Sequence, residues 1–378
     1  MVVGYARGAV EKAMKLQQVI LRAMSGEISW IQAAQIAGVR PRTLRRYRLQ
    51  YEEVGYDGLF DRRRRLPSPK RVPVKEVEHV LRLYRERYAG FNVRHFVDVA
   101  RREHGIALSY SFIKIALQQA GLVRKHRARG KHRKRRERKA NFGAMLHIDG
   151  SSHVWLAHVP EQRQSLITVV DDATSRILYS QLWPGETTVA VMTALFEVVS
   201  THGIPASLYS DRAGWGVFTP MAGGKPDRTK LTEVGKVLKK LGVEHIVSYS
   251  PQARGRSERI NRTLQGRLVN ELRVARIQSI EKANRYLRDA FLPRYNEAFS
   301  CEPADPHSAF VGPGKADLDA IFCFEDQRCV GQDNTVVYER VRMQIPKQRG
   351  RRTCAGLHVT VRRHLDGTHS IWLGPNCL

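Results

Sequence analysis

The chain has 378 residues, 42% of them hydrophobic, which is enough for roughly two to four folded domains with their own cores. Lys and Arg number 64 against 36 Asp and Glu, and the net charge of +28 is typical of a protein that binds a polyanion such as nucleic acid. No stretch approaches roughly 18 uninterrupted apolar residues and no secretory leader is visible, so we expect a cytoplasmic protein rather than a membrane or secreted one.

The positive charge is concentrated in the first part of the chain. Residues 1–140 contain 34 Lys and Arg and 12 Asp and Glu, a net charge of +22. The other 238 residues contain 30 and 24, a net charge of +6. We therefore expect the front of the chain to bind the polyanion, and the nearly balanced remainder to contain a folded catalytic core.

The first predicted unit is a helix-turn-helix. An amphipathic stretch at 10–24 precedes Ser29, which can cap a short helix at 30–37, and after a glycine turn Pro41 opens a second helix. In this motif the second helix enters the major groove of DNA. Its candidate DNA-contacting residues are Arg42, Thr43, Arg45 and Arg46. The alternative is a small helical bundle with a solvated basic face.

A linker and a second helical unit follow. The segment 61–69 is charged and then proline-rich, as linkers are. Apolar residues then recur at helical spacing in 77–84, 91–103 and 109–117. Two interpretations stay open for this unit, a second helix-turn-helix or helical packing with no DNA contact, because few of its charges lie at useful positions.

The segment 124–139 contains eleven Lys and Arg and one acid, so it cannot bury itself. We expect an arm that folds onto phosphates, and a merely solvated linker is the alternative. The candidate phosphate-binding residues of this arm are Arg124, Lys125, Arg127, Arg129, Lys131, Arg133, Lys134, Arg135 and Arg136.

From about residue 142 the pattern predicts a mixed α/β sheet with helices packed on it, in the order βββαβαβα. Strand-like runs lie at 144–148, 165–170, 176–183, 207–210 and 244–249, and helical patterns lie at 187–202, 232–241, 257–273 and 280–298. A glycine-rich insert at 213–226 is interpreted as an active-site loop.

The end of the chain looks all-β. The pair Asp366-Gly367 between the runs 359–364 and 370–373 predicts a hairpin with a type I′ turn. Five cysteines, none before Cys301, show no CxxC spacing, so we expect reduced thiols and neither a disulfide framework nor a zinc site.

Three widely spaced carboxylates are the candidate catalytic and metal-binding residues. Asp149 ends the first strand-like run, Asp211 follows the fourth, and Glu258 stands near the start of a helix. Magnesium prefers oxygen ligands, and a pair of such ions can bind both the attacking and the leaving oxygen of a phosphoryl displacement. An ionised carboxylate at the end of a buried strand needs a partner or a metal, which favours the functional interpretation.

Each carboxylate also has a structural interpretation. The alternative for Asp149 is a helix or turn cap that runs through residues 150–152, and the alternative for Asp211 is an Asx-turn residue beside Arg212. The neighbouring Asp171 and Asp172 are interpreted as a turn between strands, outside the site.

The helix that begins near Glu258 has one apolar side, formed by Ile260, Leu264 and Leu268. A solvated ion pair between Glu258 and Arg262 is the structural alternative for this glutamate. Several arginines surround it, and their planar guanidinium groups suit DNA phosphates. These candidate DNA-binding residues are Arg254, Arg256, Arg259 and Arg262.

Three sequence elements carry a resemblance. They are His147-Ile148-Asp149, Tyr209-Ser210-Asp211-Arg212 and Ser250-Pro251-Gln252-Ala253-Arg254-Gly255-Arg256-Ser257-Glu258-Arg259-Ile260-Asn261-Arg262. Together they resemble the DDE catalytic core of bacterial insertion-sequence transposases in the retroviral-integrase superfamily, specifically the ISNCY-type group. The third element is the most specific, and the resemblance extends over residues 20–370.

The resemblance implies an RNase H-like fold and two Mg²⁺ ions, replaceable by Mn²⁺, held by Asp149, Asp211 and Glu258. It implies cleavage at transposon ends and transfer of the freed 3′-OH to target DNA. The implied partners are double-stranded DNA and further copies of the chain when two ends are paired, with no membrane. The implied location is the bacterial cytoplasm, near the nucleoid.

Two departures from the family pattern matter. The 46 residues between Asp211 and Glu258 make a longer gap than is common in the superfamily, so Glu233 and Glu244 stay open as third acids. The zinc-binding N-terminal domain of retroviral integrases is absent, because no cysteine precedes Cys301. Recognition of the ends then falls to the helix-turn-helix.

The predicted fold is multidomain, α plus α/β. Its domains are a helix-turn-helix at 1–65, a second helical domain at 66–123, a basic arm at 124–141, an RNase H-like mixed-sheet core at 142–312 and a β-rich domain at 313–378. The predicted function is a metal-dependent DDE transposase. The alternatives are an inactive DNA-binding regulator with an RNase H-like core and a nuclease without strand transfer.

Overall fold

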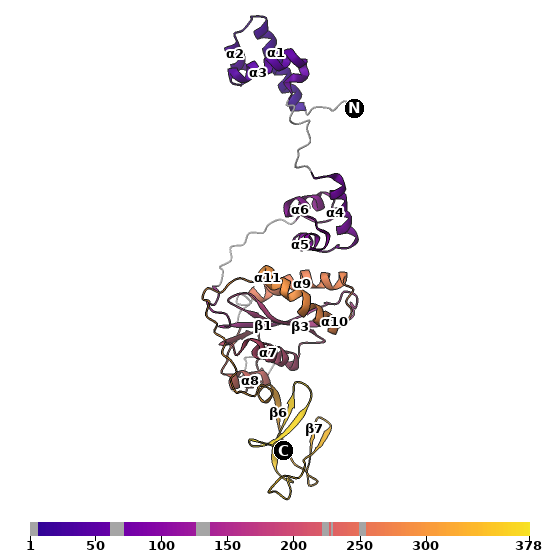
Figure 1. Ribbon diagram of the computed structural model, residues 1–378, viewed down its shortest axis with the longest axis vertical. Coiled ribbons are helices and arrows are strands. Elements are labelled where there is room, and N and C mark those ends of the chain that lie inside the picture. Colours follow the sequence, from indigo (N-terminus) through magenta and orange to yellow (C-terminus); the bar gives the residue numbers. More distant parts are fainter. Residues whose placement is uncertain (1–6, 61–71, 126–136, 221–226, 228–229, 249–254) are drawn as a thin grey trace. The chain divides into compact units, whose positions relative to one another are not determined.

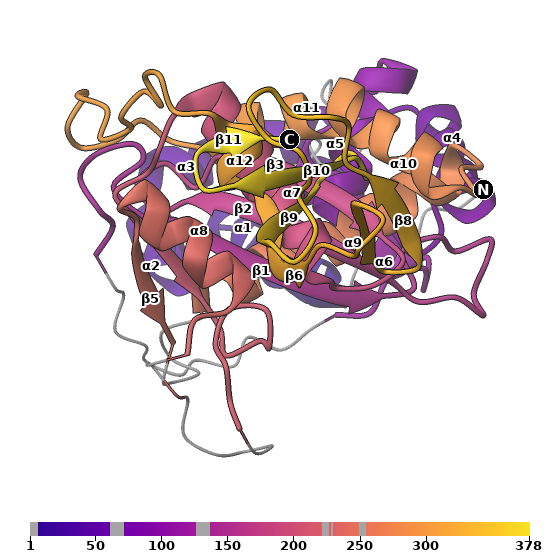
Figure 2. The same cartoon turned by 90° about the horizontal axis from the view of Figure 1, so that it is seen from below.

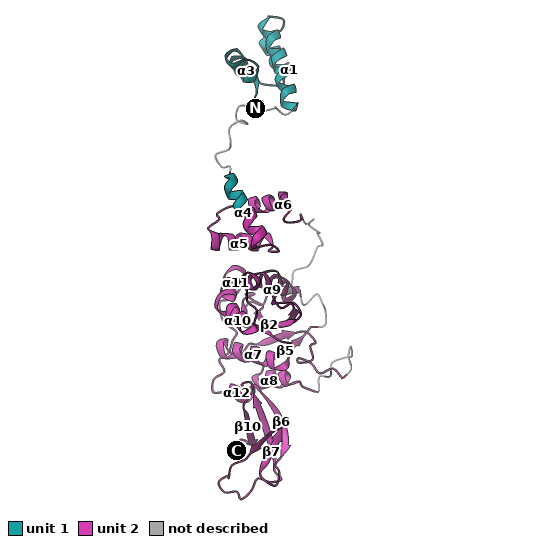
Figure 3. Ribbon diagram, turned by 90° about the vertical axis from the view of Figure 1, so that its right-hand side faces the viewer, with its two compact units in different colours: residues 1–79 teal, residues 80–378 magenta. Residues whose placement is uncertain are grey.

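A computed structural model describes residues 7–60, 72–125, 137–220, 227, 230–248 and 255–378. The chain forms two compact units, residues 1–79 (unit 1) and residues 80–378 (unit 2), which are coloured separately in Figure 3. Each is considered by itself. The predicted linker at 61–69 and most of the basic arm lie outside the described residues, and the boundaries of the five predicted domains stay predictions.

Unit 1 contains the predicted helix-turn-helix. Its elements are α1 (Arg7–Met24), α2 (Trp30–Ala37), α3 (Pro41–Val54) and a 3-10 turn, η1 (Gly55–Leu59). Ser29 and Gln32 form a reciprocal capping box at the start of α2, and Gly38 ends it in the left-handed conformation at φ 67°. The three helices bury Ile20, Ala33 and Leu44 between them.

The predicted second helical domain contains α4 (Val74–Glu86), α5 (Val93–His104) and α6 (Tyr110–Gln119), with residues 74–79 of α4 in unit 1 and the rest in unit 2. Asn92 and Ser109 cap α5 and α6 through their side chains. The core between the helices is aromatic, with Tyr88 and Phe96 fully buried.

Unit 2 also contains a five-stranded mixed sheet. Its strands are β1 (Leu146–His153), β2 (Gln164–Asp171), β3 (Ile177–Trp183), β4 (Ser207–Ser210) and β5 (Glu244–Val247). The spatial order is β3-β2-β1-β4-β5. The first three strands are antiparallel neighbours, whereas β4 runs parallel to both β1 and β5. This is the RNase H-like arrangement that the sequence predicted.

Helices cover both faces of this sheet. They are α7 (Thr188–His202), α8 (Glu233–Leu241), α9 (Gly255–Val274), α10 (Ile280–Tyr286), a π-helical turn, η4 (Leu287–Phe291), and α11 (Leu292–Phe299). Figure 1 shows α9 and α11 on one side of the strands and α7 and α8 on the other. The order βββαβαβα is confirmed.

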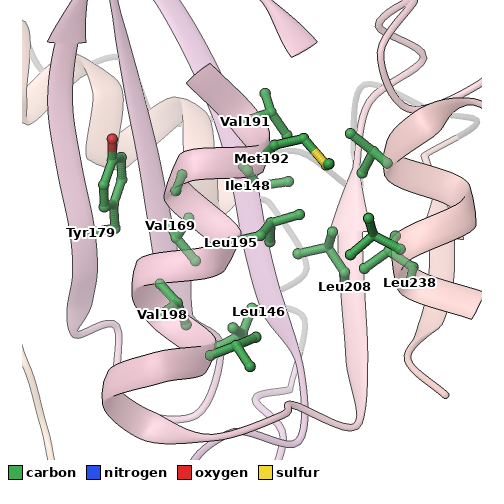
Figure 4. Close-up of a cluster of buried hydrophobic side chains, with 14 of the residues drawn as sticks. Leu146, Ile148, Val169, Tyr179, Val191, Met192, Leu195, Val198, Leu208 and Leu238 are labelled. Atoms are coloured by element: carbon green, nitrogen blue, oxygen red, sulfur yellow. The ribbon is translucent and has the colours of Figure 1, made fainter. Parts of the chain in front are cut away.

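Each face of the sheet packs against its own apolar cluster. Leu146 and Ile148 of β1 pack with α7 and α8 in the cluster drawn in Figure 4. On the other face Leu264 and Leu268 of α9 are fully buried, as the helix pattern predicted. Because side chains alternate along a strand, residues 147, 149 and 151 of β1 face α9.

One sequence prediction about β1 is wrong. The strand does not end before Asp149 but continues to His153, so Asp149 lies in the middle of it and the turn cap through residues 150–152 does not form. Gly150, Ser151 and Ser152 look like turn residues, yet they pair with residues 165–167 of β2. Pairing with a long neighbouring strand overrides their weak strand propensity.

The end of the chain is β-rich. Its elements are α12 (Leu318–Ile321), β6 (Cys323–Cys329), β7 (Thr335–Tyr338), β8 (Val341–Gln344), β9 (His358–His364), β10 (His369–Leu373) and β11 (Asn376–Cys377). The strands of the four-stranded sheet, in the order β11-β10-β9-β6, are labelled in Figure 2. Strand β7 pairs with β8 in a separate two-stranded sheet.

The predicted hairpin between β9 and β10 forms, but its turn is not type I′. Gly367 has a positive φ of 86°, whereas Asp366 is absent from the positive-φ residues. The amide of Gly367 donates to the His364 carbonyl, which closes a three-residue connection with glycine at its left-handed position.

Two further expectations concern membranes and cysteines. In the described part of the chain, no helix combines the length and apolar character needed to cross a membrane. All five cysteines are free thiols, so none is in a disulfide.

Candidate active site

Asp149 is the most enclosed of the three predicted acids. It lies opposite Thr168 of β2, and only 9% of its surface is exposed. Its Oδ2 accepts a hydrogen bond of 2.9 Å from the Nδ2 of Asn261 on α9. One turn further along α9, Gln265 donates to the Ser151 hydroxyl at 3.0 Å. The polar side of α9 therefore lies along the face of β1 that carries Asp149.

Asp211 lies just beyond the strand next to β1. His147 of β1 is the register partner of Tyr209 in the parallel strand β4, and their rings are 4.9 Å apart. Asp149 and Asp211 each follow this pair by two residues in the same direction along the chain. Asp211 also accepts a 2.9 Å hydrogen bond from the Ala213 amide, so the Asx turn that was its structural alternative is present.

Glu258 lies in the first turn of α9 and is exposed. It stands one helical turn before Asn261, the residue that contacts Asp149. No ion pair joins Glu258 to Arg262, both of which belong to the described residues, so the structural alternative for this glutamate is not observed. Ser257 beside it is buried.

The donor set suits a hard divalent cation, because all three side chains supply carboxylate oxygens. The placement of the two aspartates after a common register pair also fits a shared ion. However, the described residues contain no group of three His, Cys, Asp or Glu side chains gathered closely enough to hold a metal. The structure thus brings the aspartates to neighbouring strands and α9 to Asp149, but it does not gather the three carboxylates.

The alternative third acids occupy other places. Glu244 pairs with Ser207 at the start of β4, at the opposite end of that strand from Asp211. Glu233 is in the first turn of α8 and accepts a 2.6 Å bond from Lys236.

Asp171 and Asp172 form the turn that was predicted, and both are completely buried. Asp172 pairs with the buried His147 at 2.7 Å and accepts from the Lys139 amide. Asp171 accepts from the Gly143 amide and from Thr174. These contacts fix the start of β1 beneath the site. Sequence reasoning missed the His147 pair, although His147 stands two residues before Asp149 and so shares its face.

The structure describes some of the predicted DNA-binding residues. On α3, Arg42, Arg45 and Arg46 are exposed and Thr43 is half-buried, whereas Arg48 pairs with Glu52. Elsewhere the exposed candidates are Arg124, Lys125, Arg259 and Arg262. The arm residues from Arg127 to Arg136 and Arg254 lie outside the described residues, and the side chain of Arg256 is not described.

Known proteins resemble this chain in sequence. A family model described as winged helix-turn helix matches residues 17–75. A Sinorhizobium fredii protein named "Putative transposase y4bF" is 28% identical over 369 residues, 96% of this chain and 79% of that protein. The "Transposase for insertion sequence IS1202" of Streptococcus pneumoniae is 27% identical over 296 residues, 68% of this chain and 62% of that protein.

Two solved structures also align with parts of this chain. The simian T-cell lymphotropic virus intasome in complex with PP2A regulatory subunit B56 gamma aligns with 79% of this chain and 97% of that chain, at 11% identity and a TM-score of 0.34. The HTLV-2 integrase catalytic core domain in complex with magnesium aligns with 40% and 90%, at 16% identity and a TM-score of 0.29. Scores this low do not establish a common fold, so the fold assignment rests on the strand order.

The family match and the sheet together define a class, a helix-turn-helix protein with an RNase H-like core. Within that class, the chain is similar in sequence to a protein named as a putative transposase over 96% of its length and to the transposase of an insertion sequence over 68% of its length. The assignments to the integrase superfamily and to its ISNCY-type group stay predictions.

Proposed function

We propose that the chain is a DDE transposase that binds transposon ends, cleaves a DNA phosphodiester bond and joins the freed 3′-OH to target DNA. The observation that carries the proposal is the placement of Asp149 and Asp211 two residues beyond a register pair of adjacent parallel strands. Sequence similarity to a transposase over nearly the whole chain supports it.

Asp149, Asp211 and Glu258 would hold two divalent metal ions, Mg²⁺ in the first place. Such ions, when bound, neutralise charge on the phosphoryl oxygens and lower the pKa of the attacking hydroxyl. The chain itself orients the groups. Asn261 fixes the Asp149 carboxylate, and the exposed Arg259 and Arg262 supply charge for the DNA strands.

Recognition of the ends is assigned to α3 of unit 1. Its exposed Arg42, Arg45 and Arg46, with Thr43, lie in the first turns of a helix that follows a left-handed glycine turn. Losing a side chain that reads a guanine should cost about 1–3 kcal/mol on the true repeat and little on random DNA. Parallel losses on repeat and scrambled duplexes for all four alanine variants would remove the reading role from α3.

The proposed function is tested by a strand-transfer assay with candidate flanking repeats, Mg²⁺ or Mn²⁺, and the full chain. Asp149→Asn should abolish both cleavage and joining while it leaves binding to the ends nearly unchanged. Binding of Mn²⁺, followed by electron paramagnetic resonance without DNA, should weaken in the same variant. Joining by Asp149→Asn at the normal rate would overturn the assignment of the site.

Two other outcomes point to the alternative functions. End binding by the unaltered chain without any metal-dependent cleavage indicates a DNA-binding regulator. Cleavage with no joined product indicates a nuclease.

A further inference from the structure

A fourth carboxylate lies next to the predicted site, in the connection between β3 and α7. Glu186 precedes Thr187, the residue that caps α7. Its Oε1 accepts a hydrogen bond of 2.7 Å from the indole Nε1 of Trp215. A bond this short suits a charged acceptor. Trp215 is only 7% exposed, and a buried indole N–H needs an acceptor.

Glu186 also covers β1 beside Asp149. A Cβ atom added to Gly150 would lie 2.1 Å from the Glu186 Oε2. The carboxylate thus occupies the space that any other residue at position 150 would fill. Successive side chains of a strand point to opposite faces, so Glu186 lies on the α7 side of β1, whereas the Asp149 side chain faces α9. This placement does not suit a shared metal ligand.

The segment that follows Asp211 is tied to the same point. The amide of Ala213 donates to Asp211, and the carbonyl of Ala213 accepts from the amides of Gly216 and Val217. Trp215 is therefore part of a closed turn that begins at Asp211. Its indole is held in the apolar cluster on the α7 side of the sheet.

We propose that Glu186 is a positioning residue that joins the Asp211 turn to β1 through Trp215, and so sets Asp211 relative to Asp149. The proposal rests on the proposed function, because the two aspartates matter only if they act together. Glu186 works through its acceptor oxygen and needs no contact with substrate.

The first test compares Glu186→Ala with Glu186→Gln. The alanine variant should lose roughly ten- to a hundredfold in the rate of end cleavage, since small displacements of reacting groups have effects of this size. The glutamine variant keeps an oxygen that can accept from Trp215, so it should recover most of the lost rate. Glu161→Ala, which alters an exposed glutamate in the β1–β2 connection, is the matched control. A glutamine variant as impaired as the alanine variant would overturn the positioning role.

The second test is a double-mutant cycle with Trp215→Phe, which removes the indole donor and keeps an aromatic ring. If Glu186 acts through Trp215, the double variant, which carries both substitutions, should be no slower than the slower of the two single variants. Trp183→Phe is the matched control, because that indole donates to Tyr179 in the same core. If the rate losses of the two single variants multiply in the double variant, Glu186 does not act through Trp215.

A third measurement does not depend on catalysis. Selective ¹⁵N labelling of tryptophan gives one indole signal per residue, and Trp215→Phe identifies the signal of Trp215. Its proton should exchange faster with solvent in Glu186→Ala, but not in Glu186→Gln. Gly150→Ala should act like Glu186→Ala, since its Cβ displaces the flexible end of Glu186.

The outcomes separate the two proposals. An inactive unaltered chain overturns the proposed function, while the indole exchange still decides whether Glu186 holds Trp215. Unchanged exchange in Glu186→Ala overturns the positioning role, whatever the activity of the chain.

Discussion

The two ends of helix α9 carry glutamates in opposite situations. Glu258, in the first turn, is exposed and makes no ion pair with the neighbouring Arg262. Glu271, near the last turn, is 8% exposed and has three partners. Its Oε1 is 2.9 Å from the Nε2 of His95, and its Oε2 accepts from Tyr286 at 2.5 Å and from Arg294 at 2.6 Å.

The partners of Glu271 come from different parts of unit 2. His95 belongs to α5 of the second helical domain, whereas Tyr286 and Arg294 belong to the core. Other bonds between α5 or its preceding loop and α9 join Arg267 to Asp98 at 3.0 Å and Arg273 to the Ala89 carbonyl at 2.7 Å. The C-terminal half of α9 thus fastens the second helical domain to the core.

The difference indicates that the two ends of α9 have different roles. A buried charge persists only where its hydrogen bonds are satisfied, so Glu271 serves structure. Glu258 is exposed among arginines at the start of the helix, so the fold does not depend on its charge in this way. The comparison predicts that changes at Glu258 affect the reaction and changes at Glu271 affect stability.

The largest effect is expected for Glu258→Gln. Loss of one charged ligand should lower the rate of cleavage on the order of a thousandfold, comparable to the loss of a strong electrostatic contact in other enzymes. The free energy of unfolding should stay within about 0.5 kcal/mol of the unaltered value, because the side chain is exposed. Rate measurement and urea unfolding check the two halves of this expectation.

Glu281→Gln, in the exposed first turn of α10, provides the control for that experiment. Normal cleavage by Glu258→Gln would move the third acid elsewhere, and Glu233 and Glu244 would then be changed in turn.

The next largest effect is expected for Glu271→Ala. It leaves Tyr286 and His95 without their acceptor and Arg294 without its counter-charge, which should lower the free energy of unfolding of unit 2 by about 3 kcal/mol. Hydrogen exchange should also show faster opening of α5. If Glu271→Ala were as stable as Glu258→Gln, the contrast between the two ends of α9 would be lost.

The sequence predicts the sheet better than it predicts these contacts. The run at 207–210 matches β4, and Ser29 and Pro41 mark the helix-turn-helix, because strand periodicity and capping are local signals. The end of β1 was predicted wrongly because Gly150 looks like a turn residue, and only its partner strand shows otherwise.

The roles of Glu186 and Glu271 could not have been predicted from local patterns. Glu186 meets a tryptophan 29 positions away, and Glu271 meets a histidine 176 positions away. The residues next to a glutamate in the sequence do not indicate such contacts with distant residues. Asn261 is an intermediate case, because it belongs to the motif at the start of α9 but its bond to Asp149 appears only in the folded chain.

A smaller effect is expected on acidification. Burial is the main cause that lowers the pKa of His95 below 6.5, against the opposing effect of Glu271, so the neutral ring donates to that carboxylate. Arg267 on α9 and Asp98 on α5 are the other charges that act on it. The unfolded chain binds a proton at this histidine near pH 6.5 and the folded chain only at lower pH, so stability should fall as the pH drops below 6.5.

The variant His95→Gln isolates the effect of His95 protonation on stability, because the glutamine amide can still donate to Glu271. The pKa of Glu271 is itself lowered from 4.5: burial acts to raise it, but the bonds from His95 and Tyr286 and the charge of Arg294 outweigh that effect. Its contribution is therefore present above pH 4.5 and is lost only below that value. Between pH 6.5 and 4.5 the stability of His95→Gln should fall less than that of the unaltered chain, as measured by thermal unfolding. Equal slopes would assign the pH dependence to other buried histidines.

The smallest effect distinguishes the arginines along α9. Arg262 is exposed near Glu258, whereas Arg267 is mostly buried and pairs with Asp98. If the N-terminal half of α9 meets DNA, Arg262→Ala should reduce the steepness of log K against log salt by about 0.9, the contribution of one phosphate contact. Arg267→Ala should leave that slope unchanged, because its charge is already neutralised within the fold. Binding of end duplexes to the full chain, titrated at several salt concentrations, measures both variants. Equal slopes for Arg262→Ala and the unaltered chain would place DNA away from the start of α9, and a change confined to Arg267→Ala would reverse the assignment of the two halves.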